Sequence, residues 1–155
     1  TVAAGGAGIS KTLRGVPKEK LVEFPVAENM QAGAALGLAL AGFVPICIYP
    51  RIDFVLLALD AIVNHIDKIP EMSEGKMTPR IIIRTSIGPK EPLDGGPQHT
   101  QSYSNELMTM CQNIIVQRLY LDDDSHEILR LYKAAYLNDC KVPATLFIET
   151  GSGYA

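Results

Sequence analysis

The chain has 155 residues, of which 47% are hydrophobic and 20% charged, and its formal net charge is −3. This length suits a single domain with one hydrophobic core, and the slightly acidic balance gives no reason to expect nucleic acid or an anionic membrane as a partner. No apolar run reaches the roughly 18 residues that a membrane-spanning helix needs, and no basic-then-apolar leader opens the chain.

An early apolar strand is followed by an unusual helix. The strand is expected over 21–26, and the small-residue helix at 28–42 has Glu28 as its only charged residue. Gly33 and Gly37 lie inside this helix, where glycine costs about 1 kcal/mol relative to alanine. Close approach of a neighbouring element or of a flat ligand would explain why both positions carry glycine.

Strands and helices alternate along the rest of the chain. A strand over 44–49 precedes a helix that Asp53 can cap, and its apolar residues from Val55 to Ile66 recur at helical spacing. This alternation predicts an α/β domain with a mostly parallel sheet flanked by helices. The remaining expected elements are strands at 80–85, 114–120 and 142–149, helices at 104–111 and 124–136, a polar loop at 70–79 and a weak helical piece at 10–14.

Several polar or aromatic positions follow the ends of the expected strands. They include Glu28, Phe54 and the long loop at 88–101. Ligands of parallel sheets bind beyond the carboxyl ends of the strands, and long irregular loops in compact domains are more often functional than not. We therefore expect these positions to converge on one edge of the sheet.

The three cysteines, Cys47, Cys111 and Cys140, show neither a close pair nor the spacing of a metal site. We expect buried thiols in a reducing compartment, which favours the cytoplasm and leaves an organelle matrix open.

Five stretches of the chain stand out as motifs when they are taken together: Phe24–Gly42, Asp60–Asn64, Ile82–Gly88, Gly96–Ser102 and Pro143–Glu149. In this order they resemble the beta chains of thiamine-diphosphate-dependent 2-oxoacid dehydrogenases and the pyrimidine-binding domain of transketolases. The resemblance implies a thiamine-diphosphate-binding fold. Residues 1–155 would then be a pyrimidine-binding domain, truncated at its N-terminus and without the usual C-terminal domain.

The resemblance gives Glu28 a catalytic and cofactor-binding role. The family's glutamate at this position hydrogen-bonds the aminopyrimidine ring of the cofactor and favours the tautomer that takes the proton from the thiazolium carbon. Sharing a proton with a ring nitrogen is easier for a carboxyl group that is buried. The alternative is an acidic residue that merely favours the N-terminus of a helix.

Four further positions match the family's site. Phe54 would stack on the aminopyrimidine, unless it is a core residue or the role falls to Ile52 instead. His99 would interact with substrate or assist proton transfer. Gln98 is a weaker cofactor-binding candidate, and Gln101 is a similar one.

Other polar residues are expected to have structural roles. His65 lies on a polar helix face and His126 in a capping segment, so both are expected at the surface. The run Asp122–Asp124 could suggest a cation site, but helix capping and solvation are favoured. Cys47 is expected in the strand core, and no metal ligands are assigned.

One family element is absent from this chain, namely Gly-Asp-Gly followed by asparagine, which holds Mg²⁺ and diphosphate. The resemblance therefore implies a pyrophosphate-binding alpha-type subunit, a heterotetramer, and a site shared between two chains. A lipoyl-bearing acyltransferase would be a further partner, and the substrate would be a small 2-oxoacid or a ketose. Asn29 replaces a glutamine common in these beta chains. The alternatives are a split transketolase-like enzyme and a non-catalytic assembly paralogue.

Overall fold

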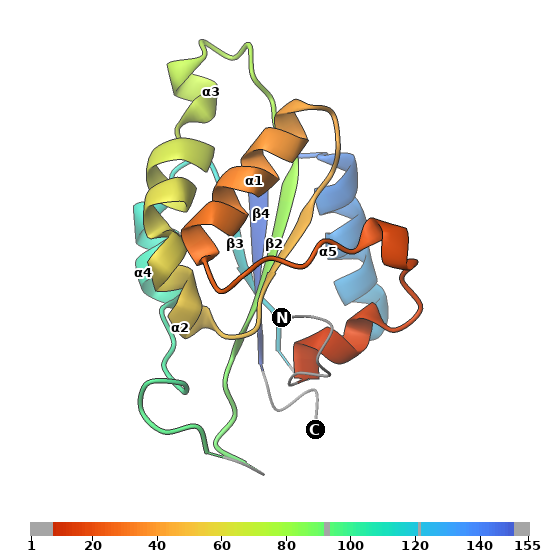
Figure 1. Cartoon of the computed structure of the whole chain (residues 1–155), viewed down its shortest axis with the longest axis vertical. Helices are drawn as coiled ribbons and strands as arrows, with labels where there is room; N and C mark the ends of the chain where they lie inside the picture. The colour runs from red at the N-terminus through yellow and green to blue at the C-terminus, as the bar shows by residue number, and fades with distance from the viewer. Residues whose placement is uncertain (1–7, 92–93, 121, 151–155) are drawn as a thin grey trace.

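Four parallel strands form the central sheet of the domain (Figure 1). In this computed structural model, which describes residues 8–91, 94–120 and 122–150, the strands are β1 (Ile46–Tyr49), β2 (Ile81–Ile87), β3 (Ile115–Arg118) and β4 (Ala144–Thr150). Their order across the sheet is β1-β2-β4-β3, and each neighbouring pair is parallel. The prediction of an α/β fold with a mostly parallel sheet is confirmed.

Helices cover both faces of this sheet, as Figure 1 shows with α5 on one side and the other α-helices on the opposite side. The helices expected at 28–42, 104–111 and 124–136 are confirmed to within a few residues. None of the helices in the described ranges is long and apolar enough to cross a membrane. The α-helices are α1 (Glu28–Leu40), α2 (Ile52–Val55), α3 (Ile69–Met72), α4 (Ser104–Met110) and α5 (Ser125–Leu137); 3-10 turns cover Gly8–Leu13, Lys18–Lys20 and Leu56–Ala58, and a π-helix covers Asp60–Ile66.

The two central strands are buried because both of their faces are covered. On β2, Ile83 belongs to the larger core that includes α1, whereas Ile82 belongs to a smaller core packed against α5. On β4, Leu146 and Phe147 divide between the same two cores. Runs of β-branched and apolar residues are typical of such strands.

The expected strand at 21–26 is not formed. This segment has no regular structure, and Val22 and Val26 are 66% and 81% exposed. Pro25 cannot donate a backbone hydrogen bond to a ladder, and its carbonyl instead accepts one from Ala27 N–H at 2.7 Å in a tight turn. The prediction was wrong because an apolar run becomes a strand only where a neighbouring strand offers an edge.

The single helix expected from Asp53 onward is instead three consecutive helical forms: α2, a 3-10 turn and a π-helix. Asp53 does not cap it, because Arg51 occupies the N-cap position without a side-chain hydrogen bond. The backbone N–H of Ala61, in the π-helix, instead donates to Asn29 Oδ1 of α1 at 3.3 Å. The two helical layers on this face are thus tied together.

Two other expectations concern helix ends. The polar loop expected at 70–79 starts later, because α3 includes Pro70 in its first turn, where a missing N–H is tolerated. The capping role of Asp124 is confirmed, since its Oδ1 accepts the backbone N–H of His126 at 3.1 Å. Asp123 likewise accepts the backbone N–H of Tyr120, at 2.6 Å.

Asp67 joins the end of the π-helix to the turn between α4 and β3. Its side chain is fully buried, and its carboxylate accepts the backbone N–H groups of Gln112, Asn113 and Ile114 at 2.8–3.0 Å. Burial alone would raise the pKa of Asp67, but these amides, together with Lys68, lower it below its usual range. Asp67 is therefore an ionised carboxylate that fixes a turn.

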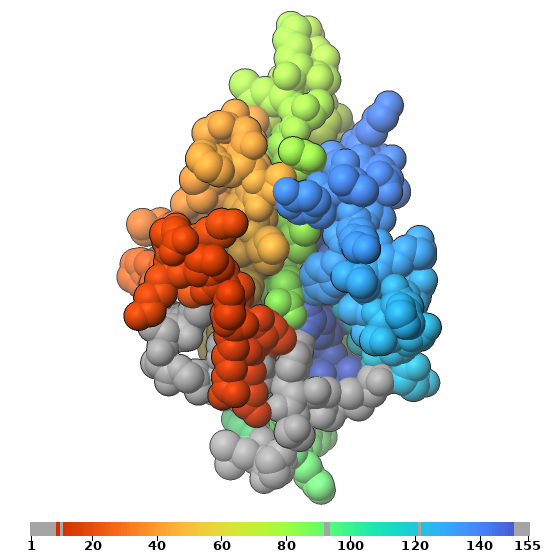
Figure 2. Space-filling model, turned by 90° about the vertical axis from the view of Figure 1, so that its right-hand side faces the viewer, coloured from red at the N-terminus to blue at the C-terminus, as the bar shows by residue number. Residues whose placement is uncertain are grey.

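The face of the sheet that α5 covers holds a polar cluster. Arg84 of β2 donates to both carboxylate oxygens of Glu149 at 2.8 and 3.0 Å, and Tyr132 of α5 also donates to Glu149. Arg84 further donates to Thr12 at 3.0 Å, which links the first 3-10 turn to the sheet. Figure 2 shows this face, with α5 in blue, the N-terminal segment in red and the green of β2 between them.

Candidate functional site

Glu28 is placed over the carboxyl end of β1. It is the first residue of α1, and its backbone carbonyl accepts the hydroxyl of Tyr49, the last residue of β1, at 3.1 Å. Glu28 is half-buried, and within the described part of the chain its carboxylate has no hydrogen bond or ion pair. A half-buried carboxylate without a partner is available to a ligand.

The residues beneath Glu28 form a buried polar support. Gln31 of α1 donates to the carbonyl of Ile48 at 3.0 Å and to the Cys47 sulfur at 3.2 Å. Burial above all raises the pKa of Tyr49, and the neighbouring Cys47 and Glu28 raise it further. Tyr49 therefore stays neutral and keeps its proton for the bond that holds the first turn of α1.

Phe54, in the short helix that follows β1, is in contact with His99. Their ring centroids lie 5.7 Å apart with the planes inclined by 56°, so the expectation that loop 88–101 approaches the end of β1 is met. His99 Nδ1 and Asp53 Oδ2 are both buried and have no hydrogen-bond partner within the described residues. Gln101 donates to the other oxygen of Asp53 at 3.4 Å. The structure thus brings two of the expected site residues into contact and leaves two buried polar atoms there unsatisfied.

Ile52 and Gln98 occupy different settings from Phe54 and His99. Ile52 is fully buried in the core, which leaves Phe54 as the aromatic residue for the role that the family implies. Gln98 is exposed, and its side chain forms no hydrogen bond with the described residues. Its cofactor-binding role stays a prediction.

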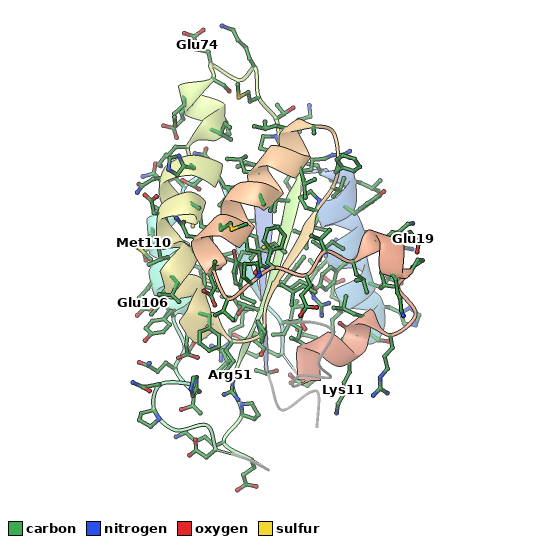
Figure 3. The ribbon with its side chains drawn as sticks, in the orientation of Figure 1. Lys11, Glu19, Arg51, Glu74, Glu106 and Met110 are labelled. Carbon is green, nitrogen blue, oxygen red and sulfur yellow. The ribbon has the colours of Figure 1, made fainter. Side chains whose placement is uncertain are left out.

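Arg51 contacts the loop that carries His99, although nothing in the sequence pattern singles it out. It lies between β1 and α2, and its Nη1 donates to the backbone carbonyl of His99 at 2.8 Å. Figure 3 labels Arg51 at the lower end of the sheet, beneath α2. A single arginine after a proline is not a recognisable motif, and no pattern in the sequence connects it with a loop 48 residues away.

The histidines and the acidic run that were expected at the surface are found there. His65 is exposed and lies 3.6 Å from Asp60, and His126 is exposed at the start of α5. In the part of the chain that the structure describes, no group of three or more His, Cys, Asp or Glu side chains could hold a metal ion. The residues Asp123 and Asp124 act in capping and turn contacts.

The cysteines differ from the expectation at one position. Cys47 and Cys111 are buried, and burial together with the charge of Asp67 raises the pKa of Cys111 to about 11. Cys140 is exposed, because it lies in the turn that follows α5. The expectation of a buried thiol is therefore wrong for Cys140.

A surface pocket of about 380 Å³ lies away from these residues. Its lining includes Arg80 and Pro143, which immediately precede β2 and β4, and Lys141. The pocket is therefore at the amino ends of the strands, whereas Glu28 lies near the carboxyl end of β1 and Phe54, just after β1, contacts His99.

Comparison with known proteins finds several relatives of the chain. No family model matches the chain. The beta subunit of the mitochondrial pyruvate dehydrogenase E1 component of Caenorhabditis elegans is 33% identical over 132 residues, which are 84% of this chain and 35% of that protein. The corresponding subunit of Drosophila melanogaster is 30% identical over 128 residues, 79% of this chain and 34% of that protein.

A further relative has a different activity. The beta subunit of acetoin:2,6-dichlorophenolindophenol oxidoreductase from Cupriavidus necator is 33% identical over 84 residues, 54% of this chain and 25% of that protein. The chain thus spans about a third or less of the length of the curated relatives that it matches.

Proposed function

Because the chain is related to the E1 beta subunits of 2-oxoacid dehydrogenases, we propose that it supplies the pyrimidine-binding half of a thiamine-diphosphate site. The observation that carries the proposal is the placement of Glu28 at the carboxyl end of β1, half-buried and with no hydrogen bond or ion pair of its carboxylate to the described residues. Parallel sheets bind ligands at this end of their strands.

The residues present fit the pyrimidine end of the cofactor. Glu28 offers an acceptor that can share a proton with a ring nitrogen, and Phe54 offers an aromatic face. Nδ1 of His99 has no hydrogen-bond partner among the described residues, and an imidazole ring can donate or accept a proton. Thiamine diphosphate, when bound, supplies the electron sink for cleavage of a bond next to a carbonyl group.

The diphosphate end requires a second polypeptide segment. The chain has no Gly-Asp-Gly element with a following asparagine, and no cluster of ligands for Mg²⁺ exists among the described residues. We infer that an alpha-type subunit holds Mg²⁺ and diphosphate, in a heterotetramer that also hands an acyl group to a lipoyl-bearing acyltransferase. The favoured reaction is decarboxylation of a small 2-oxoacid with acyl transfer, in the cytoplasm or an organelle matrix.

Cofactor titration tests this proposal. We expect isothermal titration calorimetry with thiamine diphosphate and Mg²⁺ to detect saturable binding when the full-length protein is mixed with its alpha-type subunit. Each protein alone should bind at least about a hundredfold more weakly, because each offers only half of the contacts. Absence of binding by the mixture would refute the proposal.

Substrate consumption separates the alternatives. The reconstituted complex should consume pyruvate-like acids and leave ketose phosphates unchanged. Consumption of ketose phosphates would instead indicate the transketolase-like alternative. Consumption of neither, in a complex that still assembles, would indicate a non-catalytic paralogue.

The outer surface of α1 provides a second prediction, on assembly. Gly33 and Gly37 are exposed, and a Cβ added at either position would meet no described atom within 4 Å. Met30 and Leu38 beside them are 57% and 39% exposed. An open apolar helix face with glycines suits the close approach of the proposed partner chain.

Replacing Gly33 with alanine should therefore have opposite effects on folding and on assembly. The free energy of unfolding of the separate protein should rise by about 0.5–1 kcal/mol, because alanine favours a helix over glycine. Association with the alpha-type subunit should weaken by about 1–3 kcal/mol, the usual cost of inserting a methyl group into a packed contact. Chemical denaturation and analytical ultracentrifugation measure the two effects, and Lys133→Ala on α5 is the control. Unchanged association would show that α1 does not face the partner.

A further inference from the structure

We propose that Arg51 is a positioning residue that holds His99 against Phe54. What His99 does in the reaction rests on the function proposed above. The way in which His99 is held follows from contacts within this chain.

The backbone at Arg51 is fixed to the centre of the sheet. Arg51 follows Pro50, whose carbonyl accepts the hydroxyl of Ser86 at 2.7 Å. Ser86 is a buried residue of β2, the strand next to β1 in the sheet. The arginine therefore extends from a point that cannot easily shift.

The tip of Arg51 fixes the backbone of His99. Its Nη1 donates to the carbonyl oxygen of His99 at 2.8 Å, a distance typical of a strong charge-assisted hydrogen bond. The ring of His99 has no comparable anchor, because Nδ1 is buried without a partner in the described ranges. The ring position thus depends on the backbone bond to Arg51 and on the contact with Phe54.

Two glycines leave the space that this contact needs. A Cβ added to Gly88 would lie 2.0 Å from the carbonyl oxygen of His99 and 2.5 Å from Arg51 Nη1. At Gly95 it would lie 2.8 Å from Arg51 Nη1 and 2.9 Å from the Cβ of His99. Distances below 3.0 Å are clashes, so only glycine at both positions permits the observed packing of the guanidinium group.

The turn that carries His99 has its own short-range hydrogen bonds. The backbone N–H of His99 donates to the carbonyl of Gly96 at 2.9 Å, and the hydroxyl of Thr100 donates to the same carbonyl at 3.2 Å. Gly96 has a φ of +81°, which favours glycine. These bonds shape the turn locally, whereas the bond from Arg51 attaches it to the segment that follows β1.

Placement of a proton-transferring group affects rate steeply. A displacement of about 1 Å can lower turnover by about a hundredfold. Removal of the Arg51 bond should therefore reduce kcat more than it changes the KM for substrate.

The test compares Arg51→Met and Arg51→Lys in the full-length protein together with its alpha-type subunit. The control is Arg80→Met, because Nη1 of Arg80 also donates to a backbone carbonyl, that of Tyr136 at 3.4 Å, but at the opposite end of the sheet. Hydrogen exchange of the His99 backbone amide reports the turn without any cofactor. Steady-state kinetics then report its effect on catalysis.

With Arg51→Met, exchange of the His99 amide should accelerate about tenfold or more and kcat should fall about a hundredfold, while KM stays within about threefold. Arg51→Lys should bring both the exchange rate of the His99 amide and kcat most of the way back to the wild-type values, because only one donor of Arg51 is used at His99. Arg80→Met should change neither quantity. If Arg51→Met leaves exchange unchanged, or if lysine performs no better than methionine, the positioning role is refuted.

The two proposals fail separately. A complex that binds no thiamine diphosphate refutes the proposed function, but the exchange of the His99 amide still decides whether Arg51 holds this turn. If the complex with Arg51→Met has normal turnover, the proposed function stands and the positioning role of Arg51 is refuted.

Discussion

Replacing Glu28 with glutamine is expected to lower the kcat of the reconstituted complex by about 10²- to 10⁴-fold, the usual contribution of a positioned proton-transferring group. Glutamine keeps the size and the position over Tyr49, but it cannot share a proton with a ring nitrogen. The placement at the first turn of α1 should persist, because Tyr49 bonds the backbone of residue 28 and not its side chain. Steady-state turnover at saturating cofactor and substrate measures the effect.

Glu19→Gln is the matched control for this experiment. Glu19 is exposed in a 3-10 turn, and Figure 3 shows it on the side of the molecule away from Arg51 and α2. Its replacement should leave kcat within about twofold, as expected for a surface change of this kind. If Glu28→Gln also left turnover unchanged in an active complex, the catalytic role proposed for Glu28 would be wrong.

Replacing Asp67 with alanine is expected to lower the free energy of unfolding by about 3–5 kcal/mol, the range for removing one partner from a buried charged contact. The substitution leaves the backbone N–H groups of Gln112, Asn113 and Ile114 without their acceptor. Asp67→Asn retains the oxygen that these amides share but loses its charge. Asp67→Asn should therefore lower the free energy of unfolding, measured by chemical denaturation, by about half as much as Asp67→Ala.

The effect of Asp67 should depend on pH with a definite sign. Its folded-state pKa is lowered, so its stabilisation is complete above the unfolded pKa of about 3.9 and is lost as the pH falls through the lower folded value. The stability gap between the wild type and Asp67→Asn should be constant near neutral pH and narrow below about pH 4. Asp139→Asn, at an exposed turn, should show no such gap, whereas a gap that persists unchanged into acid would contradict this account.

The strands at the centre of the sheet could be predicted because strands buried on both faces are rich in β-branched and apolar residues. The expected strands at 80–85 and 142–149 correspond to β2 and β4 with ends shifted by one or two residues. Capping chemistry is also local, which is why Asp124 could be assigned from the residues that follow it. Local signals of this kind do not depend on distant parts of the chain.

The failures have a common physical origin in distant contacts. The apolar pattern at 21–26 could not show that no strand edge was available to pair with it. The regular periodicity from Val55 to Ile66 gave no sign of a π-helix, whose amide at Ala61 bonds to Asn29 from another helix. Tertiary contacts decided both segments.

The candidate site could be predicted in part, for a related reason. The family resemblance indicated Glu28, Phe54 and His99. The strand-end rule predicted that Glu28, Phe54 and the loop at 88–101 converge, and the contact between Phe54 and His99 bears out the part that concerns Phe54 and the loop. Arg51 and Asp67 were missed because they bond to backbone atoms 45 or more residues away in the sequence. A backbone N–H or carbonyl group does not depend on the side chain of its residue, so the sequence does not show which residues supply such partners.

Within the described sheet, β1 is an outermost strand, and the residues that gather near its end lie on the rim of the fold. A rim can be reached from outside without moving any element of the domain. If another polypeptide completes the site there, the gene for this chain and the gene for that polypeptide have to be inherited together. When the gene for this chain is expressed in a foreign host, we would then expect activity only if the gene for the partner chain is expressed with it.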